Sequence, residues 1–202
     1  MNLAESTTKI NLMKAFAGES LARNRYALAA ELATKQNMYF IHQIFKFTAH
    51  QEQQHARIFY DFLKPINGGN IDIAAGYPVG DFDDLGKLLR EAQHNEYQEH
   101  NSIYPEFARI ARDEGFANIG LAFEQIAKIE ETHGNRFGTF AELIEQAKLF
   151  KADGQTVWLC LNCGHIHIGP EAPQKCPVCQ YAQGYFVPEK YYKFIASEYT
   201  KP

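Results

Sequence analysis

Apolar residues recur every three or four positions through the first 150 residues, which is the spacing of one buried face of an α-helix. The pattern breaks at a stretch that contains glycine and proline, residues 65–80, whose length suits a crossover between two helical hairpins. We therefore predict four long helices: one over residues 9–35, one over 37–64, one that starts at 81–84 and runs to 114, and one over 116–149.

Two local signals bear on the ends and the shape of these helices. Thr7 and Thr8 precede the first helix and can act as N-caps, because a hydroxyl can accept a backbone N–H there. Pro105 falls inside the third helix, where it removes a backbone hydrogen bond and should kink the helix or end it. The apolar period resumes at Phe107, so we expect one bent helix.

The pattern changes near residue 153, where short β-type runs alternate with turns. A region of about fifty residues is too small to rely on its apolar core alone. It holds all four cysteines, in two C-x-x-C pairs: Cys160, Cys163, Cys176 and Cys179. We predict an all-α four-helix bundle over residues 1–150, followed by a small, mostly irregular or β metal domain over residues 151–202. The end of the chain, residues 189–202, receives no assignment.

Every predicted helix carries acids or histidines on its apolar stripe. They are Glu19 in the first helix, Glu52 and His55 in the second, Glu96 and Glu99 in the third, and Glu130 and His133 in the fourth. A buried, unpaired carboxylate costs several kcal/mol, so protonation or bound cations must neutralise these acids. The histidines favour cations, because neutral imidazole is a common ligand of iron, manganese and zinc.

The order of these residues repeats along the chain. A single glutamate is followed, 33 residues on (positions 19 and 52) and again 34 residues on (positions 96 and 130), by E-x-x-H. Residues three apart share a helix face, so each E-x-x-H can present both ligands to one point. A lone E-x-x-H is more often a surface pair, but two matched copies fit the ligand pattern of two-metal carboxylate bundles. The other histidines are interpreted as non-ligands: His42, His50, His94, His100, His165 and His167.

Composition narrows the class of protein. The 202 residues are 46% hydrophobic and 22% charged, with a formal net charge of −4, which gives no case for nucleic acid or an anionic membrane surface. No window of about 18 apolar residues is present to span a membrane, and the N-terminus does not read as a secretory signal. We expect a cytoplasmic protein. In a reducing cytoplasm the cysteine pairs favour a metal site, and two disulfides in an exported domain are the weaker alternative.

Several segments together resemble the rubrerythrins: AFAGESLARNRY (15–26), EQQH (52–55), EYQEHNSIYPEFARIARDEGF (96–116), IEETHGNRF (129–137) and the cysteine module. The resemblance covers nearly the whole chain. It implies a ferritin-like bundle, a rubredoxin-like domain and a third helix that is continuous though bent. It also implies a non-haem di-iron site on Glu19, Glu52, Glu96, Glu99, Glu130 and His133, with His55 as a redox-dependent ligand.

The resemblance adds roles to three further features of the site. One iron is thought to move, as it is reduced, between the residues that match Glu99 and His55. Tyr26 and Tyr104 match family tyrosines beside the iron pair, where either core packing or a hydrogen bond to a ligand carboxylate or bound peroxide would explain them.

Four thiolates suit one tetrahedral ion, and their spacing alone does not choose between zinc and iron. The CPVC segment, the neighbouring aromatic residues and a two-iron bundle that needs electrons favour an Fe(Cys)4 centre, with zinc as a possible substitute. Gln180 departs from the rubredoxin pattern, which usually has a small residue after the last cysteine. A side chain at that position could distort the turn whose amides donate to sulfur.

The expected function is reduction of hydrogen peroxide to water at the di-iron pair. Electrons would come through the Fe(Cys)4 centre from a rubredoxin or an NAD(P)H-linked rubredoxin reductase, because the chain's own glycine-rich loop, NGGN, is no dinucleotide fingerprint. The resemblance implies a homodimer in which the cysteine domain of one subunit approaches the di-iron site of the other. The alternatives are a ferritin-like ferroxidase or iron-storage protein and a non-enzymatic, zinc-bound scaffold.

Overall fold

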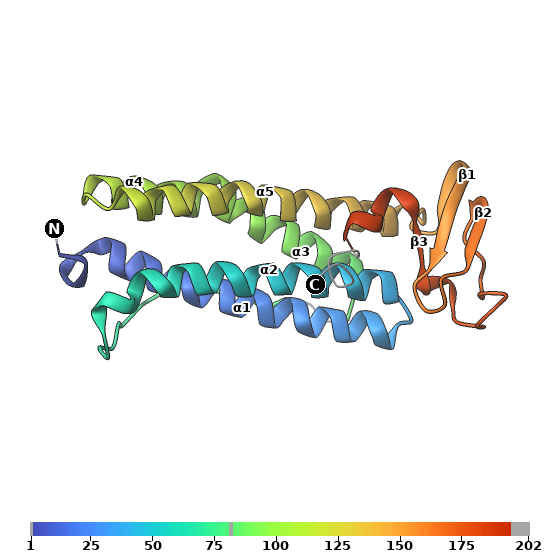
Figure 1. Cartoon of the computed structure of the whole chain (residues 1–202), viewed down its shortest axis with the longest axis horizontal. Coiled ribbons are helices and arrows are strands. Elements are labelled where there is room, and N and C mark those ends of the chain that lie inside the picture. Colours follow the sequence, from blue (N-terminus) through green and yellow to red (C-terminus); the bar gives the residue numbers. More distant parts are fainter. Residues whose placement is uncertain (1, 81–82, 195–202) are drawn as a thin grey trace.

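The computed structural model describes residues 2–80 and 83–194. Long helices run alongside one another, and a small sheet lies at one end of the molecule (Figure 1). The helices are α1 (Thr7–Lys35), α2 (Tyr39–Leu63), α3 (Leu85–Gln98), α4 (Tyr104–Asp113) and α5 (Ala117–Glu145). The mainly helical fold with a small strand-containing end confirms the predicted fold class. None of the described helices combines the length and the hydropathy that crossing a membrane requires.

The N-cap of α1 differs from the prediction. Ser6, rather than a threonine, caps the helix, and its side chain accepts the Lys9 N–H at 3.1 Å. The amides of Thr7 and Thr8 instead donate to the carboxylate of Glu114, each at 2.8 Å. An acid from the distant end of α4 therefore satisfies first-turn N–H groups that would otherwise lack a partner within the helix.

The third predicted helix is continuous but irregular. Between α3 and α4 lies a π-helical segment, Glu99–Ile103, and the Tyr104 N–H bonds back to the Glu99 carbonyl. Pro105 stands at the start of α4, where its missing N–H is tolerated. One extra residue in a turn rotates all the following side chains about the helix axis by about 100° relative to a regular helix. In a regular helix Tyr104 would point about 80° away from the direction of Glu96. With the π segment the two side chains point within about 20° of each other.

Of the other helix ends, one agrees with the prediction and one does not. α3 begins at Leu85 with Asp84 as its N-cap, at the end of the predicted start over 81–84; Asp81 itself is outside the described residues. α5 ends at Glu145, four residues before the predicted end. Ala147 adopts a left-handed φ of 54°, and the Lys148 N–H returns to the Leu143 carbonyl at 2.8 Å. This is a Schellman-type ending made without glycine, which hid it from sequence inspection.

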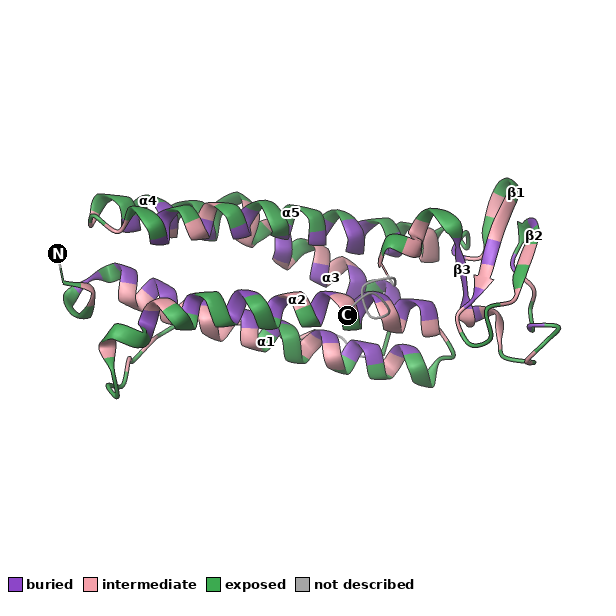
Figure 2. Cartoon of the chain, in the orientation of Figure 1, coloured by how far each residue is buried: buried purple, intermediate pink, exposed green. Residues whose placement is uncertain are grey.

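The helices bury their apolar faces against one another, as the inward-facing purple segments in Figure 2 show. Among the described residues, the core of the bundle consists of two clusters, and a third cluster lies in the sheet region around Trp158. Tyr26, Phe45 and Phe137 belong to one bundle cluster, and Phe59 and Phe123 belong to the other. On each helix the stripe acids and histidines occupy positions between residues of the two clusters. The ionisable side chains are therefore enclosed by apolar packing along the bundle in both directions.

The C-terminal part forms a three-stranded antiparallel sheet in the order β2-β1-β3, from β1 (Lys151–Cys160), β2 (Ile166–Glu171) and β3 (Phe186–Pro188). Short 3-10 turns cover 183–185 and 189–194. The division into domains at residue 150 stays a prediction; it falls between the last residue of α5 and the first of β1.

The sheet region packs on the end of the bundle near the turn between α1 and α2 (Figure 1). The ring of Tyr185 stacks on that of Tyr39, with 4.5 Å between centroids. Gly184 passes so close to this turn that an added Cβ would stand 1.8 Å from the Asn37 carbonyl oxygen. Only glycine allows the two backbones to approach in this way.

Candidate metal centres

The acids and histidines of the helical stripes converge inside the bundle in two groups of donor atoms. Within each group the donor atoms all lie within 4.8 Å of one another. One group comprises Glu19, Glu52, His55 and Glu130, and the other comprises Glu52, Glu96, Glu130 and His133. Glu52 and Glu130 belong to both groups, which places them to bridge two ions.

These donor atoms lie close to one another, but their hydrogen-bonding capacity is not satisfied. His55 Nδ1 lies 2.9 Å from one Glu130 oxygen, and His133 Nδ1 lies 2.7 Å from the other. The contacts are close but not aligned as hydrogen bonds, so both nitrogens and both oxygens are buried without a hydrogen-bond partner. Buried polar atoms are otherwise almost always hydrogen-bonded. The side chains therefore fit two cations among them, which would use these lone pairs.

Crowding perturbs the protonation of the carboxylates. Burial, and after it the charge of Glu130, raises the pKa of Glu19 to about 8. Burial and the neighbouring Glu52 raise the pKa of Glu96 well above its ordinary value. Although burial opposes it, His133 lowers the pKa of Glu52. Metal ligands must be deprotonated, so cation binding at this site is coupled to release of protons.

Both tyrosines bond to acids of the donor groups. The Tyr104 hydroxyl donates to Glu19 Oε1 at 2.5 Å, and the Tyr26 hydroxyl donates to Glu96. The side chains are 1% and 3% exposed, so both hydrogen bonds lie in the interior. Of the two explanations that the sequence left open, the geometry favours a hydrogen bond to a carboxylate of the site.

Glu99 lies beside the two donor groups rather than within them. It is half-buried, whereas the residues of the donor groups are at most 5% exposed. Glu99 lines a pocket of about 410 Å³ between α1, the π segment and the 65–80 linker. Gly18 borders this pocket, and a Cβ there would lie 3.8 Å from Glu99 Oε1 and 3.7 Å from the Tyr77 ring. Of the two residues predicted to exchange, the structure has His55 among the donors and Glu99 at the edge.

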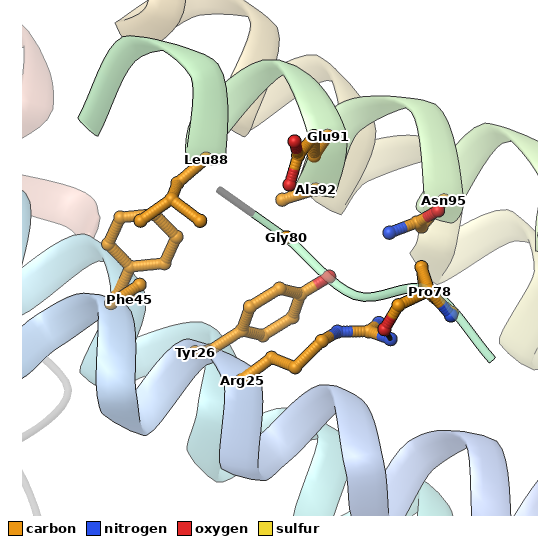
Figure 3. Close-up of a pocket in the computed structure, with 10 residues that line it drawn as sticks. Arg25, Tyr26, Phe45, Pro78, Gly80, Leu88, Glu91, Ala92 and Asn95 are labelled. Carbon is orange, nitrogen blue, oxygen red and sulfur yellow. Dashed lines mark hydrogen bonds between the residues drawn. The ribbon is translucent and has the colours of Figure 1, made fainter. Parts of the chain in front are cut away.

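The linker between the hairpins covers the same face farther along the bundle. Figure 3 shows it running between Arg25 and Tyr26 of α1 and Asn95 of α3. The Arg25 guanidinium donates to the Pro78 carbonyl at 3.5 Å, and the space left beside Tyr26 is only about 20 Å³. The pocket at Glu99 is thus the wider of the two openings on this face.

Sequence reasoning missed two residues behind the donor groups. His133 Nε2 lies 3.1 Å from Gln51 Oε1, and that oxygen also accepts from Arg136 at 3.0 Å. Arg136 is 8% exposed although it carries a charge. Its place one helical turn after His133, next to Phe137 of the apolar stripe, was the available signal.

The four cysteines surround a single point in the sheet region. Cys160 Sγ and Cys179 Sγ are 3.7 Å apart, and Cys163 Sγ and Cys176 Sγ are 3.6 Å apart. A disulfide bond is about 2.05 Å long, whereas thiolates around a tetrahedral ion with bonds of about 2.3 Å stand roughly 3.8 Å apart. The cysteines are free, so the donor set fits a tetrahedral ion and not the two disulfides of the alternative.

The turn after the last cysteine keeps its shape despite its side chain. Gln180 adopts a φ of 64°, close to the 77° of Gly164 at the matching place after Cys163. The N–H of Gln180 bonds to the Cys176 carbonyl at 2.9 Å, and that of Gly164 bonds to the Cys160 carbonyl at the same distance. Gln180 therefore does not distort the turn, as the sequence suggested it could. It adopts instead a left-handed backbone conformation, which is unfavourable for a residue other than glycine.

Comparison with known proteins agrees with both parts of the chain. Residues 11–141 match the family model described as rubrerythrin, and residues 158–187 match the rubrerythrin rubredoxin-like domain. The chain belongs to the rubrerythrin family. It is 44% identical to a rubrerythrin of Clostridium perfringens over 92% of this chain and 95% of that protein. It is 40% identical to a rubrerythrin of Nitratidesulfovibrio vulgaris over the same shares of the two chains.

A solved structure of nigerythrin in a mixed-valence state is similar at a TM-score of 0.61 and 27% identity, over 92% of this chain and 90% of the other. Rubrerythrins are iron-binding proteins with peroxidase-type activity. The rubredoxin-like match, the four clustered cysteines and the two carboxylate and histidine groups together confirm the predicted cofactor set: a di-iron site in the bundle and a metal bound by four cysteines. The role of each individual side chain stays a prediction.

Proposed function

We propose that this rubrerythrin is a peroxidase that reduces hydrogen peroxide to water at its di-iron site. The observation that carries the proposal is the pair of interlocking donor groups beside an acid, Glu99, that faces an open pocket. When bound, the iron pair supplies two electrons and Lewis acidity to the substrate. The balance is one peroxide, two electrons and two protons giving two waters.

The side chains of the site have separate tasks in this proposal. Glu52 and Glu130 hold both irons, because each contributes to both donor groups. His55, a member of one donor group, and Glu99, beside that group at the pocket, would be the two ligands that exchange on one iron. Tyr104 holds a proton at its hydroxyl, on Glu19 Oε1, and steadies that carboxylate while the charge of the site changes. The pocket at Glu99 gives a small polar substrate a way in from solvent.

The four cysteines would hold one iron, which would supply electrons to the bundle one at a time, and we propose a rubredoxin or an NAD(P)H-linked rubredoxin reductase as their source. Within one chain the sheet contacts α2 at Tyr39, and Glu52 lies 13 residues farther on. At 1.5 Å per residue this is about 20 Å of helix. Because electron tunnelling needs short distances, this separation favours a head-to-tail homodimer in which the cysteine centre of one subunit serves the di-iron site of its partner.

Replacement of one cysteine ligand tests this division of labour. Cys176→Ser should abolish steady-state turnover with a reductase while the chemically reduced protein still oxidises once with hydrogen peroxide. Loss of the single turnover in a variant that keeps two irons in the bundle would contradict the proposal.

The two alternatives give different results in simple measurements. A ferroxidase or storage protein predicts that the reduced protein reacts as fast with O2 as with peroxide and releases iron into a mineral core. A zinc-bound scaffold predicts a colourless protein that contains only zinc after growth with ample iron. The cytoplasmic location stays a prediction, which fractionation of the source cells would test.

A further inference from the structure

Arg136 places a positive charge inside the bundle. Among the described residues it is the one lysine or arginine that is buried. Its guanidinium donates to the Thr48 hydroxyl at 2.8 Å and to Gln51 Oε1 at 3.0 Å, and both partners are uncharged. A buried charge without an ion-pair partner is costly, so packing alone gives no reason for an arginine here.

Gln51 connects this charge to a ligand. Its side-chain oxygen lies 3.1 Å from His133 Nε2, whereas His133 Nδ1 is a member of the donor group. An amide oxygen can accept from two donors, so the Arg136 N–H and the His133 Nε2–H together fix which end of the amide faces them. This arrangement keeps the proton on Nε2 and leaves Nδ1 free to bind a cation.

Aromatic rings cover the guanidinium on its outer side. The ring centroids of Phe47 and Phe194 lie 4.8 and 5.2 Å from Arg136 Cζ. Such contacts stabilise a cation and displace water from it. The field of the charge is therefore less screened than that of a surface arginine.

The positive charge of Arg136 can offset the net negative charge of the site. Five carboxylates lie in the donor groups or beside them: Glu19, Glu52, Glu96 and Glu130 are members, and Glu99 is their neighbour. Two ferrous ions leave one negative charge among them, which one guanidinium neutralises. Burial lowers the pKa of Arg136 from its ordinary value, while Glu52, Glu96 and Glu130 oppose that shift.

We propose that Arg136 and Gln51 are positioning residues of the di-iron site: Gln51 orients His133, and the charge of Arg136 favours the reduced form of the metal pair. This inference rests on the two-metal site and not on peroxidase activity. A protein that failed as a peroxidase would still test it.

The test of Arg136 is the reduction potential of the di-iron site, measured by spectroelectrochemical titration of the iron-loaded protein. Arg136→Met keeps the length and removes the charge, so the potential should fall. For one charge at roughly 10 Å in an effective dielectric of about 20, the ferric-to-ferrous ratio at fixed potential should rise about 15-fold. Arg136→Lys keeps the charge and should stay close to the parent protein.

Two references in the same experiment separate the charge from general damage. Arg57→Met makes the same change on α2 at a side chain that is 74% exposed, and it should not move the potential. The Fe(Cys)4 centre of each variant should keep its own potential. If Arg136→Met and Arg57→Met gave the same value, or if Arg136→Lys fell as far as Arg136→Met, the role of the charge would be refuted.

The test of Gln51 is iron affinity, measured by competition with a chelator. Gln51→Leu leaves His133 Nε2 without an acceptor and should weaken iron binding ten- to a hundredfold. Gln51→Glu keeps an acceptor and should bind iron at least as tightly as the parent protein. Parent-like affinity in Gln51→Leu, with circular dichroism showing an intact bundle, would overturn the positioning role.

Discussion

Removal of the metals should make the stability of the bundle fall as the pH rises from about 5 to about 8. Burial, then Glu130, raises the pKa of Glu19 from 4.5 to about 8. Between these values the folded protein holds a proton that the unfolded chain has released, so unfolding becomes easier as the pH increases. One pKa unit corresponds to about 1.4 kcal/mol, so a shift of about 3.5 units sets a ceiling near 5 kcal/mol.

The neighbouring ionisable groups do not reverse this fall of stability with rising pH. The pKa values of His55 and His133 are raised by contacts with Glu52 and Glu130, although burial acts in the opposite direction. Above pH 6.5 the unfolded chain loses these protons first, so the histidines add to the decline. The pKa values of Glu52 and Glu130 are lowered, so the stability they contribute is lost only at acid pH, below about 4.5.

The assay is urea unfolding of metal-free protein at pH 5, 6.5 and 8, followed by circular dichroism. Glu19→Gln is the matched control, because it keeps the shape and removes the titrating group. Its stability should decline less steeply, by up to about 1.4 kcal/mol per pH unit. In the iron-loaded protein the slope should reverse, because protons compete with the metal. Metal-free stability that stayed constant or rose over this range, equally in both proteins, would refute the reasoning.

Three substitutions probe other parts of the structure. Tyr104→Phe removes a hydrogen bond to a buried carboxylate, worth about 1.5–3 kcal/mol, and should weaken iron binding ten- to a hundredfold in chelator competition. Gln180→Gly relieves a left-handed conformation and should stabilise the cysteine domain by about 1 kcal/mol in thermal unfolding. Gly18→Leu should fill the pocket at Glu99 and slow single turnover with peroxide, whereas Asn24→Leu, on another groove along α1 that none of the donor residues lines, should not. Equal rates in these two leucine variants would show that peroxide uses another route.

The helices and the donor residues could be predicted because both depend on local periodicity. A stripe that contains Glu52 and His55 at helical spacing identifies its face without knowledge of the partner helices. The repeat of E-x-x-H then indicates that two such faces meet. Helix ends were less accessible, since the N-cap is Ser6 and the C-terminal turn has an alanine, Ala147, where glycine is usual.

The Gln51 and Arg136 pair could not be predicted, because its meaning lies in a contact between α2 and α5. The two residues are 85 positions apart, and neither type is a metal ligand. A glutamine beside a stripe is usually on the surface, and the place of Arg136 next to the stripe suggests that it lies near the core but does not show what it contacts. Only the packing of the two helices brings His133, Gln51 and Arg136 into one chain of hydrogen bonds.

The π segment explains how one helix supplies three different functions to the site. Glu96 faces the donor groups before the segment, and Glu99, at its first residue, is turned toward the pocket at the edge. After the segment the helix face is set back by about 100°, so Tyr104 meets Glu19 inside the bundle. A regular helix would carry Tyr104 away from this carboxylate. The π segment therefore lets a ligand and a hydrogen-bond donor share the inner face while an acid between them stays accessible from solvent.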